Sequence, residues 1–435
     1  MKRIGYLLIL LASLSLIFQP ARAQSDEPLV LVMTADGPIM PPMLEYFKRG
    51  IETAEQRNAE MLVIQLNTPG GSISTMFEMI EAIGKSKVPV IIYVAPQDAQ
   101  AASAGALITM AGHASAMAPR TVIGAASPID SSGGDIESTL EKKIKEDLKA
   151  KARTLVEGRG DEATQLAEAM IDDAKAVTAD EALEVKLIDF IADDTEDLLQ
   201  LLNGFTVQMS DGPRTLNTEN ANTQPLDMRF IEQFLLLLTD PNIAFLLIAI
   251  GVQSVLIEIS SPGGWVAGFI GVVCLTLATY GLGVLPVNWF GIIFLITAFV
   301  LFILDIKAPT HGALTVAGVA SFIIGALVLF NSPGTPEFQR VSVPLVVGVG
   351  VFLGLLFFGI LMFALSALRA PISMGVESFV GKTGTAKSWN EASGQVQLDS
   401  ELWSAESVDK SDKISKGDKV EVVEVRGIRL KVKKK

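Results

Sequence analysis

The sequence predicts a chain of three parts: a soluble α/β domain with a parallel sheet, an all-helical membrane domain and a small all-β barrel. Strand patterns alternate with amphipathic helix patterns over residues 25–197, which is typical of α/β domains. Long apolar runs with few charges occupy residues 230–368 and predict membrane-spanning helices. Short alternating segments separated by glycines lie in residues 376–435 and predict strands of a barrel.

The overall composition excludes several classes of partner and cofactor. The 435 residues carry a net charge of −13, and no basic patch interleaved with aromatic residues offsets it, so nucleic acid is not an expected partner. The single cysteine, Cys274, can form neither a disulfide within the chain nor a multi-cysteine metal site. Two histidines, His113 and His311, are a poor supply of zinc ligands. We therefore expect no metal and no other cofactor.

The first residues have the pattern of a secretory signal. Lys2-Arg3 precedes an apolar run from Leu7 to Phe18 and then Ala21-Arg22-Ala23, which matches a basic region, a short hydrophobic region and an Ala-x-Ala end. An uncleaved anchor helix is the alternative, but the run is shorter than the roughly 20 residues that a span needs. Residues 1–23 are therefore predicted to be a signal peptide that exports the domain behind it.

The soluble domain is predicted over residues 24–200, with strands and helices that alternate as in parallel sheets with right-handed crossovers. Strands are predicted at 29–33, 61–66, 88–95, 115–118, 121–125 and 187–191, and helices at 42–58, 74–86, 104–111, 138–157 and 162–171. Residues 130–139 are polar and contain glycine, which predicts a loop. Thr178 and Glu181 have the spacing of a capping box. The polar residues 201–229 are predicted to be a linker with a small β-unit.

The membrane domain is predicted over residues 230–370. Glycine and proline turns divide it into about five spans, at 242–259, 264–284, 288–305, 311–330 and 343–368. An odd number of spans after an exported start places Arg369 and Lys382 in the cytoplasm, in agreement with the positive-inside rule. Asp305, Lys307 and His311 lie between the third and fourth spans; we expect loop residues near one membrane face, with a functional intramembrane site as the alternative.

The last part, residues 371–435, is predicted to be a five-stranded barrel of the OB type. Glycines at 381, 384, 394, 417 and 427 separate short alternating segments at the spacing that such barrels show. OB barrels often bind nucleic acid through stacking aromatic residues, but here only Phe379, Trp389 and Trp403 are available. A module for protein contacts is the expected role.

Two strand ends converge on one serine in the soluble domain. The strand at 61–66 continues into Asn67-Thr68-Pro69-Gly70-Gly71, and the strand at 88–95 precedes Ser103 in Ala101-Ala102-Ser103-Ala104-Gly105. Adjacent glycines allow positive φ and let backbone N–H groups face an anion, and small neighbours leave the serine open to another chain. The alternative is a glycine turn and a small-residue helix that only pack in the core.

These two segments resemble the glycine oxyanion loop and the nucleophile turn of the ClpP/crotonase superfamily. The resemblance implies a domain of repeated β-β-α units in which Ser103 is a nucleophile. In ClpP the base is a histidine near the strand that corresponds to residues 122–127, and no histidine stands there in this sequence. His113, ten residues after the serine, is expected to fill or cap the end of a buried helix. A Ser-His-Asp triad is therefore not supported.

A lysine can replace histidine as the base when desolvation disfavours its charged form. The segment Lys143-Ile144-Lys145-Glu146-Asp147 looks like the lysine segment of the NfeD membrane proteases, whose glycine loop, nucleophile segment and post-serine strand resemble 68–71, 101–105 and 118–125 here. The resemblance covers nearly the whole chain. It departs at Asn67, at 125–127 and in a shorter segment at 157–159, which leaves Lys142 as an alternative to Lys143.

The resemblance implies a membrane-anchored serine endopeptidase with a Ser103–Lys143 dyad and an oxyanion hole formed by Gly70, Gly71 and Ala104. It also implies cleavage of hydrophobic segments of membrane proteins, stomatin-like or flotillin-like partners, and a homo-oligomer. The expected location is the bacterial inner membrane, with the protease domain outside and the barrel in the cytoplasm. The alternative function is a non-catalytic scaffold that organises stomatin-like or flotillin-like proteins in the lipid bilayer. Crotonase-type acyl-CoA chemistry is disfavoured because an exported domain meets no coenzyme A.

Overall fold

A computed structural model describes residues 27–128, 138–260, 264–308, 310, 312–332, 335–369, 376–409 and 411–435. The predicted signal peptide, almost all of the predicted loop at 130–139 and His311 lie outside these residues. The chain divides into two compact units, residues 1–303 with 314–354 and residues 304–313 with 355–435, and each unit is described by itself.

The N-terminal domain contains most of the predicted elements of the soluble part. Its strands are β1 (Leu29–Asp36), β2 (Met61–Asn67), β3 (Val90–Val94), β4 (Gln100–Ala102), β5 (Ala114–Met117), β6 (Val122–Gly124), β7 (Ala176–Thr178), β8 (Phe190–Ile191), β9 (Thr206–Met209), β10 (Gly212–Thr215) and β11 (Asn222–Pro225). Its helices are α2 (Pro41–Gln56), α3 (Ile73–Lys85), α4 (Ala104–Ala111), α5 (Ser138–Leu155), α6 (Asp161–Asp172), α7 (Ala179–Glu184) and α8 (Thr195–Leu202). The predicted capping box is confirmed at the start of α7.

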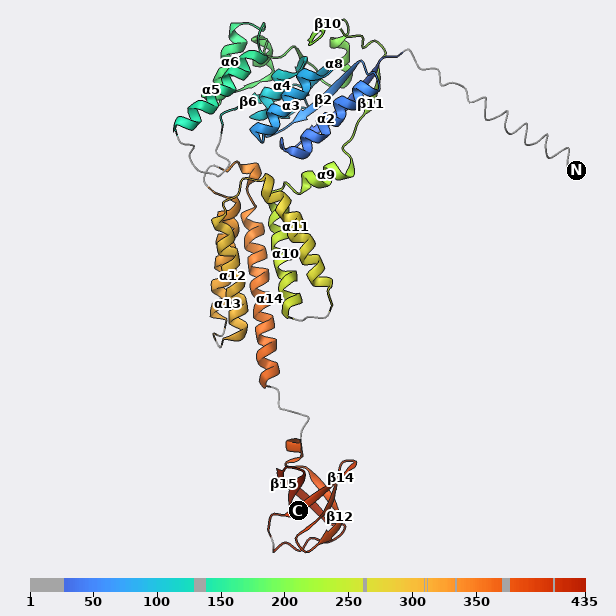
Figure 1. Ribbon diagram of the computed structural model, residues 1–435, viewed down its shortest axis with the longest axis vertical. Coiled ribbons are helices and arrows are strands. Elements are labelled where there is room, and N and C mark those ends of the chain that lie inside the picture. The colour runs from blue at the N-terminus through green and yellow to red at the C-terminus, as the bar shows by residue number, and fades with distance from the viewer. Residues whose placement is uncertain are drawn as a thin grey trace, which may run out of the picture. The chain divides into compact units, whose positions relative to one another are not determined.

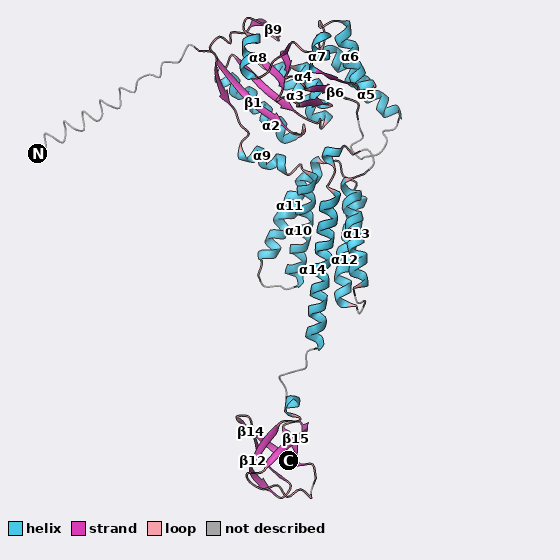
Figure 2. Ribbon diagram, turned by 180° about the vertical axis from the view of Figure 1, so that it is seen from behind, coloured by secondary structure: helices cyan, strands magenta, loops and turns pink. Residues whose placement is uncertain are grey.

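The main sheet has six parallel strands in the order β11-β1-β2-β3-β5-β8, and a second sheet has the order β4-β6-β7. Helices α2, α3 and α4 pack on one face of the main sheet, and α8 with the β9–β10 hairpin covers the other (Figures 1 and 2). Both faces are therefore buried, which explains why the central strands read as continuous apolar runs. This architecture brings the end of β2 beside the start of β4.

Residues 201–229, which were predicted to be a linker with a small β-unit, are part of the N-terminal domain in the structure. They contain the end of α8 and the β9–β10 hairpin, and β11 adds to the main sheet by pairing with β1 from Leu29↔Asn222 to Val32↔Pro225. The sequence pattern hides β11 because its side chains are mostly exposed, as an edge strand allows. The predicted strand at 187–191 is also shorter than expected, since only Phe190–Ile191 pairs with β5.

A short helix, α9 (Phe230–Leu237), connects the sheet to the membrane domain and is fastened to α2. The Nε of Arg49 donates to Glu232 Oε1 at 2.6 Å, and its Nη2 donates to Glu232 Oε2 at 2.8 Å. Tyr46 adds a hydrogen bond from its hydroxyl to the carbonyl oxygen of Leu226 at 2.5 Å. The start of α9 is therefore held by a bidentate ion pair as well as by the chain.

The membrane domain consists of α10 (Pro241–Ser260), α11 (Val266–Val284), α12 (Phe290–Lys307), α13 (Ala313–Phe330) and α14 (Val343–Arg369). Each predicted span coincides with one of these helices. Among the described residues, four apolar stretches are long enough to cross a membrane, at 241–259, 266–284, 313–330 and 337–359, and α12 contributes a shorter one, Phe290–Asp305. Asp305 and Lys307 belong to the last turn of α12 rather than to a loop, and the Asp305 carboxylate is buried and accepts from Thr310 Oγ1.

Hydrogen bonds between helix ends fix the direction of these helices. The N–H of Asn288, just before α12, donates to the carbonyl of Leu329 at the end of α13 at 2.9 Å. The N–H of Ser342, just before α14, donates to Asn242 Oδ1 at the start of α10 at 2.8 Å. Consequently α10, α12 and α14 all begin at the same end of the domain, where α11 and α13 finish.

The C-terminal domain, taken by itself, is a closed barrel. A short 3₁₀ helix (Val376–Phe379) precedes β12 (Thr383–Asn390), β13 (Ser393–Leu398), β14 (Glu401–Ser407), β15 (Lys419–Arg426) and β16 (Arg429–Lys434). The strands close in the order β12-β13-β14-β16-β15 around a small apolar core. Five strands in this order are consistent with an OB fold, so that prediction is confirmed.

Candidate active site

Ser103 occupies a sharp turn between β4 and α4. Its backbone has φ 54° and ψ −117°, a conformation that a residue with a side chain rarely adopts and that is typical of a nucleophile on a strand-to-helix turn. The turn is held on both sides, because the N–H of Ser103 donates to Gly124 O at 2.8 Å and that of Ala102 donates to Thr68 O at 3.0 Å. The surrounding sheet therefore stabilises a strained residue.

The glycine loop after β2 lies against this turn. Gly70 has φ +111°, and a Cβ atom on it would stand 2.6 Å from the Cβ of Ser103. A Cβ atom on Gly71 would stand 2.2 Å from the carbonyl oxygen of Ile39. Hydrogen bonds from Ile39 N to Gly70 O and from Ser72 N to Ile39 O hold the loop in this place. Both positions consequently require glycine.

Two of the three predicted oxyanion residues present unpaired donors. In the described part of the chain, the N–H groups of Gly71 and Ala104 have no acceptor. Ala104 is also the first residue of α4, where the helix dipole favours negative charge. The N–H of Gly70 is already used, since it donates to Thr68 Oγ1 at 3.1 Å. Gly70 thus supplies the backbone conformation of the loop and leaves room for Ser103, whereas Gly71 and Ala104 are the free donors.

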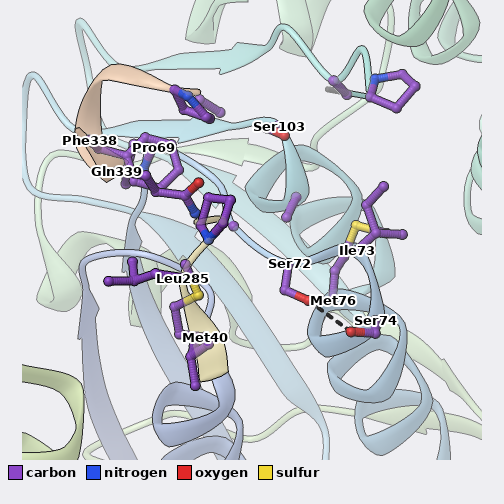
Figure 3. A pocket seen from close by; sticks show the side chains of 18 of the residues that line it. Met40, Pro69, Ser72, Ile73, Ser74, Met76, Ser103, Leu285, Phe338 and Gln339 are labelled. Carbon is purple, nitrogen blue, oxygen red and sulfur yellow. Dashed lines mark hydrogen bonds between the residues drawn. The ribbon is translucent and has the colours of Figure 1, made fainter. Parts of the chain in front are cut away.

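Ser103, Gly71 and Ala104 line a cavity of about 1100 Å³ (Figure 3). The walls come from the glycine loop and the start of α3, from the residues after β6, from α5 and from the ends of the membrane helices. In Figure 3, Met40, Ile73 and Met76 line it on the side of the N-terminal domain, together with Ser72 and Ser74, whose hydroxyls are 2.8 Å apart. None of the described lining residues carries a charge.

The structure does not bring the predicted lysine base to the serine. Lys143 and Lys142 are exposed on α5, and neither lines the cavity. The face of α5 that lines it carries Leu140, Ile144 and Leu148, and the helical period turns the residues next to Ile144 away from it. Among the described residues, the hydroxyl of Ser103 has no hydrogen-bond partner.

His113 has the structural role that the sequence indicates. Its Nδ1 accepts a hydrogen bond from the N–H of Val90 at 3.1 Å, at the start of β3, and the residue does not line the cavity. Burial lowers the pKa of His113 below its usual value and so favours the neutral ring that accepts this bond.

Sequence reasoning missed two residues that shape the site. Thr68 belongs to the motif from which the loop was predicted, but no role was assigned to it. It is fully buried, and its hydroxyl holds the glycine loop by hydrogen bonds to Gly70. Gly124, with φ +131°, presents its carbonyl to Ser103, and a Cβ there would stand 2.3 Å from Lys175 O.

Within the described residues, no group of three His, Cys, Asp or Glu side chains could hold a metal ion.

The chain is similar to known proteins over nearly its whole length. The membrane-bound protease PH1510 of Pyrococcus horikoshii is 36% identical over 97% of this chain and 97% of its own. The chain belongs to the NfeD family. Three family models match it: the N-terminal domain of NfeD1b at residues 30–222, the NfeD integral membrane domain at 242–367, and the NfeD-like C-terminal, partner-binding domain at 376–434. Membrane protein NfeD1b of Bacillus subtilis is 26% identical over 97% of this chain and 96% of its own.

Solved structures are similar to the N-terminal half of the chain. A lysine-to-alanine mutant of the 1510-N membrane-bound stomatin-specific protease, in complex with a substrate peptide, is 34% identical. It covers 49% of this chain and 99% of that chain with a TM-score of 0.46. ClpP1 from Listeria monocytogenes is 18% identical, with 38% and 94% coverage and a TM-score of 0.33.

Proposed function

We propose that this member of the NfeD family is a membrane-bound serine endopeptidase that cuts hydrophobic segments of membrane-associated proteins. The observation that carries the proposal is the turn of Ser103, whose free hydroxyl shares a cavity with the unpaired N–H groups of Gly71 and Ala104. A nucleophile beside preorganised donors is what acyl transfer requires. A full-length relative named as a membrane-bound protease supports the same reaction.

The proposed reaction is acyl transfer to Ser103. The Ser103 hydroxyl attacks a peptide carbonyl and its proton passes to the neutral amine of Lys143, while Gly71 and Ala104 stabilise the oxyanion. The protonated amine then gives its proton to the leaving amine of the substrate. A water molecule, deprotonated by the same lysine, releases the acyl group and restores the serine. Lys142 is the alternative base.

The proposed dyad requires a change in α5, because neither lysine lines the cavity in this structure. The C-terminal half of α5 is anchored by Leu148 and Ala152, which are buried in the core. The N-terminal half is held less firmly, since Leu140 is 51% exposed and Ile144 is only partly buried against the core. We propose that substrate, or a second copy of the chain in a homo-oligomer, displaces this half of α5 and so brings Lys143 to Ser103.

The proposed substrate is apolar because the described walls of the cavity carry no charge. The similar solved structures belong to a stomatin-specific protease, and we extend that substrate class to this chain as a stomatin-like partner. The family description of the barrel as partner-binding fits recruitment of such a protein. We place the protease domain outside the bacterial inner membrane, because residues 1–23 have the pattern of a signal peptide, and the barrel in the cytoplasm, because an odd number of spans would separate the two.

Peptide hydrolysis by the full chain in detergent micelles tests the proposal. Ser103→Ala is expected to lower the rate by on the order of 10⁴-fold, as loss of a nucleophile does. Ser74→Ala is the matched control, because this serine also lines the cavity but its hydroxyl only pairs with Ser72. Equal rates in the wild type and Ser103→Ala would contradict the proposal, and no hydrolysis by any of them would favour the scaffold alternative.

A further inference from the structure

The wall of the cavity opposite the protease domain is built by the membrane domain. The segments that precede α12 and α14 meet there, at the ends of the spans that face Ser103. Trp289 and Phe338 are the aromatic members of this wall (Figure 3 labels Phe338 next to Gln339). The cavity therefore extends from the nucleophile to the ends of the helices of the membrane domain.

This wall is a fixed structure, held by hydrogen bonds away from the cavity. Asn288 binds the end of α13 through its N–H and through its side chain, whose Nδ2 donates to Ser332 Oγ at 3.2 Å. Asn331 pairs with both backbone groups of Val341, at 2.8 and 2.9 Å. These polar groups keep the two segments in place, so the side chains that reach the cavity are free to contact a ligand.

The side chains of the wall are suited to contact an apolar peptide segment. Leu285 is buried, whereas the Trp289 side chain is 62% exposed although it lines the cavity. An exposed aromatic residue beside an apolar cavity, at the membrane boundary, can cover an apolar segment that leaves the bilayer. The opposite wall offers the apolar face of α5 through Ile144 and Leu148.

We propose that Trp289 and Phe338 of the membrane domain are specificity-determining residues of the peptidase, which hold the apolar flank of a peptide where it emerges from the membrane. The inference rests on the proposed function and deepens it. A substrate segment that is still partly in the bilayer would lie along this wall and present its next peptide bond to Ser103. Charged flanks would be rejected because no described residue of the walls carries a charge that could pair with them.

Binding to the catalytically inactive full chain tests the inference without depending on hydrolysis. The Ser103→Ala chain in lipid nanodiscs is titrated with a fluorescein-labelled peptide of leucine, valine and alanine, and empty nanodiscs supply the baseline. Adding Trp289→Ala or Phe338→Ala is expected to raise the Kd about tenfold, which is typical when an apolar group is removed from a pocket. Phe290→Ala is the matched control, since this neighbour is 70% exposed but does not line the cavity.

The outcomes separate the inference from the proposed function. An unchanged Kd in both wall variants, or an equal increase in Phe290→Ala, would overturn the inference. A peptide of serine, glycine and glutamate that binds as tightly as the apolar one would also overturn it. If the wall variants weaken binding but the wild-type chain cleaves no peptide, the wall binds apolar segments and the peptidase proposal fails.

Discussion

The side chain of Ser103 stands where a side chain on Gly70 would have to go. A Cβ on Gly70 would lie 2.6 Å from Ser103 Cβ and 3.1 Å from its hydroxyl oxygen. The glycine loop and the nucleophile turn, which are thirty-three residues apart in the chain, are therefore fitted to each other. Substitution of the glycine acts on the site through this contact as well as through the backbone.

Gly70→Ala is expected to lower kcat/KM by on the order of 10²-fold, because the new methyl group displaces Ser103 from the donors of Gly71 and Ala104. Its positive φ adds a folding cost of about 1–3 kcal/mol. Gly37→Ala is the control, since Gly37 also has a positive φ, of +122°, but open space around its Cβ. It should lower the melting temperature and keep kcat/KM. Equal activity losses in the two variants would show that strain alone is responsible.

Lys143→Ala is expected to lower peptide hydrolysis by on the order of 10⁴-fold, because Lys143 is the proposed base for the proton of Ser103. Lys142→Ala should retain most of the rate. Rates of peptide hydrolysis measured for both variants check this, and the reverse order of losses would move the base to Lys142.

His113→Gln is expected to keep most of the activity, because the His113 side chain accepts the N–H of Val90 and does not line the cavity. Burial lowers its pKa in the folded state, so its contribution to stability is complete above the unfolded pKa, near 6.5, and is lost as pH falls through the folded pKa. The wild type should therefore lose more stability than the variant on acidification. Melting temperatures above and below this range check it, and an inactive variant with native circular dichroism would contradict the dyad.

The two soluble domains are expected on opposite sides of the membrane if α12 crosses it together with the four longer apolar stretches, because five crossings reverse the side. A reporter that is active only outside the cytoplasm should give a strong signal when fused after Asp240, before α10, and no signal after Lys435. α12 decides the result, since its apolar stretch, Phe290–Asp305, is the shortest of the five. Signals from both fusions would mean an even number of crossings and would place the barrel beside the protease domain.

The glycine loop, the serine turn and the positions of the five helices α10 to α14 were predicted well, because each depends on local chemistry, although only four of the described apolar stretches are long enough to cross a membrane. Gly70 and Gly71 stand where no Cβ fits, and the apolar runs are separated by turns. The strand β11 was missed because its pairing with β1 is made by the backbone and leaves its polar side chains outside. A pattern of side chains carries no signal for such an edge strand.

The wall formed by Trp289 and Phe338 could not be predicted either, because it depends on how distant helix ends meet. The helical period of α5 predicts that Ile144 and Lys143, as adjacent residues, point in different directions. Ile144 lines the cavity of Ser103, and Lys143 does not. The lysine was assigned by resemblance, and its approach to Ser103 remains a prediction about a state in which α5 is displaced.

Covalent labelling of Ser103 is the most direct test of the central claim. The full chain in lipid nanodiscs would be treated with a fluorophosphonate, digested and analysed by mass spectrometry. We predict one adduct, on Ser103, that is absent from Ser103→Ala and retained in Ser74→Ala. Peptide hydrolysis that continues while Ser103 stays unlabelled, or labelling that is unchanged in Ser103→Ala, would contradict the account.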